Sequence, residues 1–597
     1  MAALTAYVRK TGSDNNGGST NGTSPERTGT DGVTNGTTTF TSLTASFTSG
    51  DVDKLINIVT KGRYRIATFV NSTTVTISGS PSAGTGLTWN LGGAVQTIGA
   101  ILANANNAFQ SVDFAIIGAG TYREVVTVSM TSATAETIIQ GDIDGSKTGD
   151  AGDVIWTAYL TDDITAPSTS SLLTLNGRDF LTFKNILMIG GNNATASCVN
   201  GTTTNSVNIV LRDCAMSMVG GPAIAYTGLA DIASNWTIDR CLIEDLAIVN
   251  ASGISIILPT SASADYDSVF LIQNSVFRGG NIGININSSG ALAFKGGGVD
   301  IFNCDLIHSF TSNLRTQNSI STAIPCTIYN SIIKGVTALN AGTSGQILED
   351  NNRILANTAR TNVTAGGASI SDASHAPLIE FGYELISGRQ LRPFGMPMAG
   401  SPLLGRGNTA GGPTVDILSR SRPSGGGSTS YAWGAYERHD TAAKETSVVH
   451  AGATAAKIVG PGDQDILIPV DASSTTISVY VRYDTNHGTT NKPQVQLLAN
   501  GEIGVVTETK TATVGVDTQE QLTFSAFTPT AKGWVVIRCI SRSAAGNGIA
   551  YFDTFSGGAQ GTQGLDYWNR GEIFPGAVAT GAGGSGGGPL IEGRLVR

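Results

Sequence analysis

The sequence has few charged residues, few histidines and no long apolar run. Charged residues make up 14% of the 597 residues, and the net charge of −9 includes no basic cluster. This pattern argues against a nucleic-acid partner. No apolar stretch reaches the roughly 20 residues that a membrane-spanning helix needs. Since the first ten residues also lack the apolar centre of a secretory signal, we expect no membrane span and no export by that route.

Glycine and small polar residues are abundant instead. The chain contains 76 glycines, and 40% of its residues are hydrophobic and regularly patterned, so the composition does not indicate disorder. Glycine and asparagine supply the left-handed backbone conformations of tight turns. The composition therefore indicates a turn-rich, all-β protein.

A polar residue recurs at the same place in six similar segments of the middle region. Successive copies are 28, 27, 34, 29 and 27 residues apart, and each follows a short alternating stretch and precedes another apolar run. A repeat of this length whose units alternate with a period of two predicts a parallel β-helix with one coil per repeat. The predicted corner residues are Asn185, Asp213, Arg240, Asn274, Asn303 and Asn330.

The cysteines fit this repeat better than they fit a metal site or a disulfide framework. Cys214, Cys241 and Cys304 directly follow corner residues, where the other copies place isoleucine or serine. Small side chains at this position are expected to stack in an inward ladder, for which cysteine is well suited. None of the six cysteines has the close CxxC-type spacing of a zinc site.

The region ahead of the repeats divides into two parts. Residues 1 to about 30 are read as an extended arm after a short strand at Tyr7–Lys10. Residues 38–90 are predicted to form a small β unit, because they alternate like strands between polar turns. The best helix candidate is 95–104, whose apolar positions 95, 98, 101 and 102 share one face.

The helix candidate and the segments at both ends of the repeats resemble a known superfamily. The helix is followed by Ile116-Ile117-Gly118-Ala119-Gly120-Thr121-Tyr122-Arg123-Glu124-Val125-Val126, and the repeats are followed by Gly400–Gly407, Arg422-Pro423 and Gly434–Glu437. These segments look like the opening and closing of right-handed parallel β-helix proteins of the pectate-lyase-like superfamily, including phage proteins. The resemblance implies a β-helix over 93–438, behind an N-terminal arm and β unit over 1–92.

The last part of the chain changes pattern. Residues 441–557 contain about eight short alternating stretches, which predicts a β-sandwich. The stretches Ile477–Thr485 and Ile549–Phe555 look like carbohydrate-binding-module jelly rolls. Residues 558–597 hold a glycine-rich linker and a short terminal peptide. That peptide is either a docking anchor or a frayed tail, and Ile591–Arg594 also matches a common protease-cleavage tag.

Catalytic candidates are sparse in the repeats. Pectin-degrading β-helix enzymes use grouped carboxylates with a basic residue nearby. The candidates for such a role are Glu244, Asp245, Asp300 and Asp305. Glu244 and Asp245 are interpreted as a solvated turn past a corner. Asp300 and Asp305 would face opposite sides of a straight strand unless a corner lies between them. Because no Asp-Asp pair or Gly-His-Gly triplet occurs in the coils, we carry over no catalytic role, and Asn303-Cys304-Asp305 is read as repeat register.

Two further sets of residues are candidates for binding. Asp142, Asp144, Asp150 and Asp153 surround a glycine turn and could hold Ca²⁺, with an ordinary Asp/Gly turn as the alternative. In the sandwich, Trp534, Tyr551 and Tyr483 could stack on sugars, although aromatic residues in strands usually belong to the core.

The sequence supports two main functional hypotheses. The favoured one, which follows from the resemblance, is a structural surface protein of a tailed-phage virion. Such a protein would be a homotrimeric fibre, spike or capsid decoration that contacts other virion proteins and binds cell-surface polysaccharide. The alternative is a tailspike-type polysaccharide depolymerase, either a lyase or a glycoside hydrolase. A secreted adhesin is disfavoured by the N-terminus.

Overall fold

The fold is described from a computed structural model. Within residues 3–556, the structure describes all positions except 105, 107, 111, 132, 161–167, 192, 203–205, 219, 229–234, 246–251, 259–269, 279–280, 289–297, 318–324, 368, 372–378, 382–393, 398–412, 416–441, 446–454, 471–473, 489, 499–505, 529–532 and 544–546. The closing segments of the resemblance, the first predicted sandwich strand at 448–453 and the linker with its terminal peptide lie outside the described residues.

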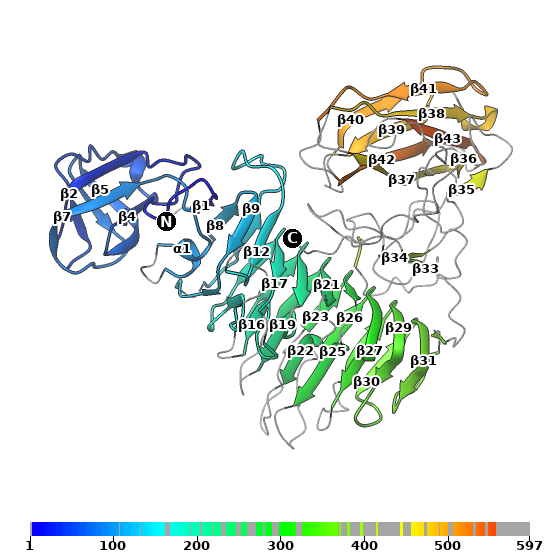
Figure 1. Ribbon diagram of the computed structural model, residues 1–597, viewed down its shortest axis with the longest axis horizontal. Helices are drawn as coiled ribbons and strands as arrows, with labels where there is room; N and C mark the ends of the chain where they lie inside the picture. The colour runs from blue at the N-terminus through cyan, green and yellow to red at the C-terminus, as the bar shows by residue number, and fades with distance from the viewer. Residues whose placement is uncertain are drawn as a thin grey trace, which may run out of the picture.

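The middle of the chain is a parallel β-helix, as predicted, and its coils stack in chain order (Figure 1). Its first face is a ten-stranded parallel sheet to which each coil contributes one strand. In spatial order the strands are β1 (Thr5–Val8), β8 (Phe114–Ile117), β11 (Thr137–Gly141), β14 (Leu181–Lys184), β17 (Ile209–Arg212), β20 (Trp236–Asp239), β23 (Phe270–Gln273), β26 (Val299–Phe302), β28 (Cys326–Tyr329) and β30 (Ile347–Asp350).

A second, sixteen-stranded sheet supplies the other two faces of the coils. The second face consists of β9 (Gly120–Arg123), β12 (Val154–Thr157), β15 (Leu187–Ile189), β18 (Ala215–Met218), β21 (Leu242–Asp245) and β24 (Val276–Arg278). The third face consists of β10 (Val126–Thr127), β13 (Leu173–Thr174), β16 (Val199–Gly201), β19 (Ile224–Thr227), β22 (Ser252–Leu258) and β25 (Ile282–Ser288). The two faces merge in the long strands β27 (Asp305–Thr316), β29 (Ile332–Asn340) and β31 (Arg353–Thr361), and β32 (Ile370–Ser371) pairs with β31.

Every predicted corner residue adopts a left-handed backbone between the first and second faces. The φ angles are 66° at Asn185, 52° at Asp213, 53° at Arg240, 50° at Asn274, 52° at Asn303 and 53° at Asn330. Asn351 continues the series with a φ of 54°. Asparagine and aspartate tolerate this conformation better than other residues with a side chain, which explains their recurrence at the corner.

The position after each corner is buried, as expected for an inward ladder. Cys214 is 2% exposed, and Ile186, Cys241, Ser275, Cys304 and Ser331 are each 0% exposed. The ladder is also hydrogen-bonded, because Ser275 Oγ accepts from the amide of Cys241 at 3.1 Å and Ser331 Oγ accepts from the amide of Cys304 at 3.2 Å. Serine and cysteine therefore alternate here without leaving the serine hydroxyls unsatisfied.

The predicted helix is much shorter than expected. Only α1 (Gly99–Leu102) is helical, because the residue at the start of the predicted helix belongs to the sheet. The backbone of Val95 bonds Tyr7 and Arg9 at 2.9 and 2.8 Å. Glu124 then accepts from the amides of Ile98 and Gly99 at 2.7 and 2.9 Å, which satisfies the first donors of the helix.

The small β unit is a closed antiparallel barrel, and it is larger than predicted. Its order is β2-β3-β6-β5-β4-β7. The strands are β2 (Arg27–Thr34), β3 (Thr39–Thr41), β4 (Leu55–Ile58), β5 (Gly62–Asn71), β6 (Thr74–Ile77) and β7 (Gly84–Leu91). The short strand expected at Tyr7–Lys10 is present as β1, two residues earlier, where it pairs with β8 of the β-helix. The extended arm expected after it is wrong at its end, because β2 closes the barrel against β7.

Buried charges join the barrel to the β-helix. Arg65 of β5 contacts the fully buried carboxylate of Asp113 at 3.2 Å, and Asp113 also accepts from the amide of Leu4 at 2.9 Å. Arg63 donates to the main-chain oxygens of Asp14 and Asn16 at 3.0 and 2.8 Å. Since removing one partner of a buried charge leaves the other uncompensated, these contacts hold the barrel firmly in place.

The C-terminal part is a β-sandwich, also as predicted. One antiparallel sheet has the order β35 (Ala442–Glu445), β36 (Ala455–Val459), β43 (Ile549–Ser556), β38 (Ser478–Tyr483), β41 (Glu520–Thr523). The other has the order β37 (Pro461–Val470), β42 (Gly533–Arg542), β39 (Gln494–Leu498), β40 (Val506–Thr511). Residues of both sheets, among them Val479, Phe552, Val495 and Ile537, share one core. Among the described residues, no helix is long and apolar enough to cross a membrane.

Candidate functional site

Glu244 lies in a strand rather than in a turn. It belongs to β21 and is only 8% exposed, so the predicted solvated turn is wrong for this residue. The strand register places it between Ser217 and Arg278 of the adjacent coils. Ser217 Oγ donates to Glu244 Oε1 at 3.3 Å, and Arg278 Nη1 lies 4.0 Å from Oε2. Asp245 ends the same strand, and its side chain is outside the described structure.

Asp300 and Asp305 lie on different faces of the same coil. Asp300 is half-buried in β26 on the first face and accepts a hydrogen bond from Thr327 Oγ1. Asp305 opens β27 on the second face and is 0% exposed. The corner at Asn303 lies between the two strands, so the intervening corner that the sequence analysis considered is present. Because of this corner, the two carboxylates lie on different faces of the β-helix.

The carboxylates of the Asp142 loop have separate protein partners. Asp142 Oδ2 accepts from the amides of Lys147 and Thr148 at 3.0 and 2.6 Å, and from the Thr148 hydroxyl at 2.7 Å. Asp144 accepts from the amide of Ser146 at 2.9 Å, and Asp150 pairs with Arg9 at 2.7 Å. Within the described residues, no group of three or more His, Cys, Asp or Glu side chains is placed to hold a metal ion. Calcium binding by this loop, including Asp153, stays a prediction.

The three sandwich aromatics differ in accessibility. Tyr483 is 0% exposed and donates its hydroxyl to the Val514 carbonyl at 2.5 Å, so it belongs to the core and presents no face to a sugar. Tyr551 is half-buried and lies in register between Lys457 and Arg482. Trp534 lies in β42, and its side chain is outside the described structure.

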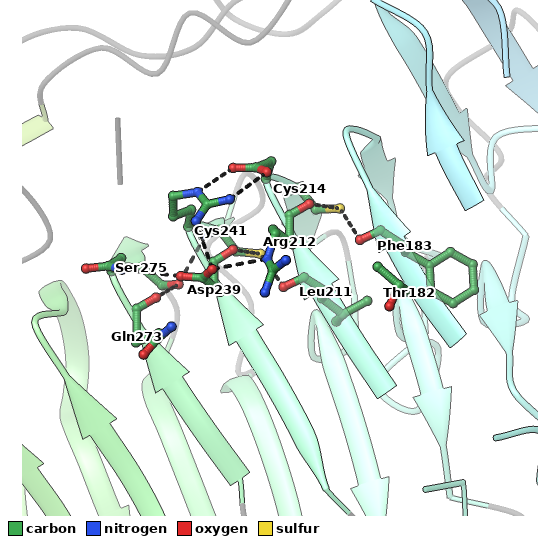
Figure 2. Close-up of polar contacts among 12 residues, drawn as sticks. Thr182, Phe183, Leu211, Arg212, Cys214, Asp239, Cys241, Gln273 and Ser275 are labelled. Atoms are coloured by element: carbon green, nitrogen blue, oxygen red, sulfur yellow. Dashed lines mark hydrogen bonds and ion pairs between the residues drawn. The ribbon is translucent and has the colours of Figure 1, made fainter. Parts of the chain in front are cut away.

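A charged network links the corners that follow the paired strands β17 and β20 (Figure 2). Arg240 binds Asp213 in a bidentate manner, with Nε to Oδ1 at 2.7 Å and Nη2 to Oδ2 at 3.0 Å. Asp239 Oδ2 receives Arg240 Nη1 at 3.0 Å and Arg212 Nε at 3.2 Å. Burial acts to lower the pKa of Arg240, but hydrogen bonding and charge from Asp213, with Asp239, raise it overall. The charges of the two arginines and the two aspartates cancel within the network, which is typical of a structural role.

The third face carries a continuous row of mostly polar side chains. Register places one residue per coil in this row, and all of them except the buried Ala225 are at least partly exposed, whereas their strand neighbours Ile284, Leu314 and Leu339 are each 0% exposed. The row consists of Thr127, Thr174, Asn200, Ala225, Ser255, Asn285, Arg315, Asn340 and Thr361. Hydroxyl, amide and guanidinium groups along a stiff sheet can donate and accept the hydrogen bonds that sugar hydroxyls need.

This row was missed from the sequence. Ser255, Asn285 and Arg315 recur at the coil repeat, since Asn285 and Arg315 are 30 positions apart. The alternation of Ile282–Ser288 was the available signal, because asparagine alternates with isoleucine there. In contrast, β10 and β13 have two residues each, too few to show a pattern.

The cysteines are poor nucleophiles in this fold. All six are buried. Burial raises the pKa of Cys198 to about 12 and raises the pKa of Cys241 well above its usual value. Because the thiolate is the reactive form, the cysteines act as packing residues.

Comparisons with known proteins identify no family. No family model and no curated protein matches the chain. Among solved structures, the chain is similar to the enzymatically active domain of tailspike protein 4 of bacteriophage CBA120, with 12% sequence identity and a TM-score of 0.15 over 82% of this chain and 71% of that one. A TM-score this low carries no argument about function, so the fold assignment depends on the sheets described above.

Proposed function

We propose that this chain is a structural surface protein of a tailed-phage particle that binds host glycan without cleaving it. Its place on a phage particle follows from the sequence resemblance. The observation that carries glycan binding is the polar row of the third face. A parallel β-helix holds successive side chains in fixed register, so a row of polar groups forms a preorganised surface for an extended polymer.

The environment of the candidate catalytic carboxylates supports a non-enzymatic role. Glu244 is buried against Ser217 and Arg278, and Asp300 accepts a hydrogen bond from Thr327. Asp305 is buried on another face than Asp300. Glycoside hydrolysis needs two carboxylates that flank one bond about 5 to 10 Å apart in a site open to substrate, and these positions do not favour that arrangement.

The sandwich is proposed as an additional carbohydrate-binding module with jelly-roll topology. Tyr551 is its best-placed candidate, because it faces outward between Lys457 and Arg482. An aromatic ring beside cationic side chains can stack on a sugar while the charges orient it. We also propose a homotrimer, as the resemblance implies, which light scattering on the purified protein would test.

The decisive experiment measures binding and cleavage in the same samples. The full chain is incubated with capsule or lipopolysaccharide from the host, bound polysaccharide is quantified by pull-down, and reducing ends and unsaturated uronates are followed over time. We expect saturable binding without product. Release of product would establish the depolymerase alternative, and Glu244→Gln, Asp245→Asn, Asp300→Asn and Asp305→Asn would then identify the catalytic groups.

Location on the particle needs a separate measurement. Mass spectrometry of purified virions and immunogold labelling are expected to find the chain in stoichiometric amounts on the outer surface. Labelling of the head would indicate a capsid decoration, and labelling of the tail a fibre or spike. Its absence from purified particles would contradict the virion assignment while leaving glycan binding open to the first experiment.

A further inference from the structure

One arginine of the third-face row has no carboxylate partner. Arg315 lies in β27, and its only hydrogen bond within the described structure runs from Nε to Asn285 Oδ1 at 3.1 Å. The Nη groups have no protein acceptor there. Four other arginines of the coils do have carboxylate partners, namely Arg212, Arg240, Arg278 and Arg360.

Amide side chains flank this guanidinium on both sides. The register places Asn285 on the preceding coil and Asn340 on the following coil, directly beside Arg315. Asn340 Nδ2 contacts Ser312 Oγ at 3.5 Å. Because neighbouring strands are about 4.8 Å apart, the three side chains span about 10 Å along the β-helix.

The Arg315 guanidinium stays charged, and the strand around it fixes its position. Leu314 and Thr316 on either side of Arg315 are 0% and 2% exposed, so the strand is anchored, whereas Arg315 itself is half-buried on the outer surface. Burial lowers the pKa of Arg315, but a guanidinium remains protonated in proteins. A partly desolvated, unpaired cation that is held by a neighbouring amide binds an anion more strongly than a fully solvated one.

We propose that Asn285, Arg315 and Asn340 form a subsite for the acidic group of a glycan. The two Nη groups would bind the anion, and the flanking amides would hydrogen-bond the sugar hydroxyls. A carboxylate, a sulfate and a phosphodiester all offer the oxygen pair that a guanidinium binds in a bidentate manner. This inference depends on the proposed glycan binding and adds to it that the ligand is anionic.

The test uses the full chain and probes of defined charge. Affinities are measured by calorimetry for polygalacturonate, dextran sulfate and a glycerol-phosphate teichoic acid, with neutral dextran as the uncharged probe. We expect the wild type to bind at least one anionic probe more tightly than neutral dextran. Arg315→Gln should weaken that binding about tenfold or more, and Arg315→Lys less than Arg315→Gln, because it keeps the charge but loses the bidentate geometry.

Arg212→Gln is the matched control. It removes one positive charge from an outer face of the β-helix, at a residue already paired with Asp239. Its affinity should stay close to wild type, which separates a local subsite from a general effect of net charge. Because Arg315 faces outward, thermal unfolding of Arg315→Gln should resemble that of the wild type.

The possible results distinguish the inference from the proposed function. If the wild type binds host polysaccharide and Arg315→Gln binds the anionic probes equally well, the acidic subsite is wrong while glycan binding stands. If Arg212→Gln weakens binding as much as Arg315→Gln, the effect is one of total charge and the subsite is again wrong. If the wild type binds neither the probes nor host polysaccharide, both proposals fail.

Discussion

Arg240 forms an ion pair with Asp213 of the preceding coil, and both residues occupy the same left-handed corner position of successive repeats. The two side chains form a bidentate pair at 2.7 and 3.0 Å, and their φ angles are 53° and 52°. The left-handed backbone conformation is energetically less favourable for arginine than for asparagine. The ion pair compensates, since it joins two coils at the point where the chain turns.

We predict that Asp213→Asn destabilises the coils around this corner by about 1 to 3 kcal/mol, because it removes the bidentate carboxylate partner of Arg240 in a partly buried site while asparagine still tolerates the left-handed backbone. Hydrogen exchange of peptides covering 209–245 is the appropriate measurement, since a chain of several folded units does not unfold in one step. Arg212→Ala, at a side chain 40% exposed, is the control and should cost under about 1 kcal/mol. Equal effects of the two substitutions would contradict the role given to the pair.

A second prediction concerns the corner conformation itself. Asn303 has a φ of 52°, is fully buried and has no hydrogen-bond partner for either amide atom within the described structure. Its backbone conformation should therefore matter more than its amide. We expect Asn303→Gly to be more stable than Asn303→Ala by about 1 kcal/mol, because only glycine adopts this conformation without steric cost.

The neighbouring ladder provides a control with the opposite sign. Ser275 is equally buried but is not left-handed, so Ser275→Gly should be less stable than Ser275→Ala. Hydrogen exchange of peptides that cover 270–278 and 299–307 in the four variants measures both differences. The same order at both positions would mean that backbone conformation does not explain the recurring asparagine.

These corners also show what was predictable from the sequence. The repeat located all six because a left-handed turn favours a short polar residue, and even Arg240 was placed by register alone. The next corner at Asn351 was missed because the coil shortens: Ser331 bonds the side chain of Asn352, only 21 positions later. The helix was predicted too long because its pattern contains Val95, whose backbone pairs with β1. Local periodicity carries no information about such tertiary competition.

The candidate site was less predictable than the fold. Single acidic residues were taken as candidates from their position relative to corners, but Glu244 and Asp305 are buried, which their sequence position does not indicate. The polar row on the third face could not be recognised from the sequence, because its strands differ in length and only their pairing in the structure aligns its residues. Arg315 stands out because it has no acid partner, which only three-dimensional neighbours can reveal.

A third prediction concerns the thiols. Since all six cysteines are buried and burial raises the pKa of Cys198 to about 12, the native protein should react slowly with a thiol reagent such as DTNB at pH 8. After denaturation, all six should react rapidly. Fast labelling of even one thiol in the native protein would show that the part of the β-helix or sandwich containing it opens readily, which the burial of all six side chains argues against.

A fourth prediction tests the Asp142 loop. Asp142 receives three hydrogen bonds from Lys147 and Thr148, so Asp142→Ala should lower the stability of this loop by about 1 to 3 kcal/mol, as measured by hydrogen exchange. These bonds need no cation, and we therefore expect EDTA to leave exchange of the wild-type loop unchanged. Faster exchange after EDTA, reversed by Ca²⁺, would instead support the calcium site considered from the sequence.

The last prediction is a pH dependence of the sandwich that centres on His487. This side chain is 2% exposed, and its Nε2 lies 3.1 Å from Ser541 Oγ. Ser541 Oγ donates to the Gly460 carbonyl at 2.6 Å, so Nε2 must be the donor to Ser541, and Nδ1 is left without a hydrogen-bond partner within the described structure. Burial lowers the pKa of His487 below its ordinary value of 6.5, with Asp484 opposing the shift.

The sign of the effect follows from proton binding. Near and below pH 6.5 the unfolded chain takes up a proton at His487 before the folded chain does, so the stability present above that pH is lost as the pH falls through the lowered folded pKa. The slope attributable to this residue is at most about 1.4 kcal/mol per pH unit. Unfolding of the sandwich, followed by hydrogen exchange of 478–487 between pH 8 and 5, should show this loss. His487→Gln should flatten the profile in that window, and an unchanged profile would assign the acid sensitivity to other groups.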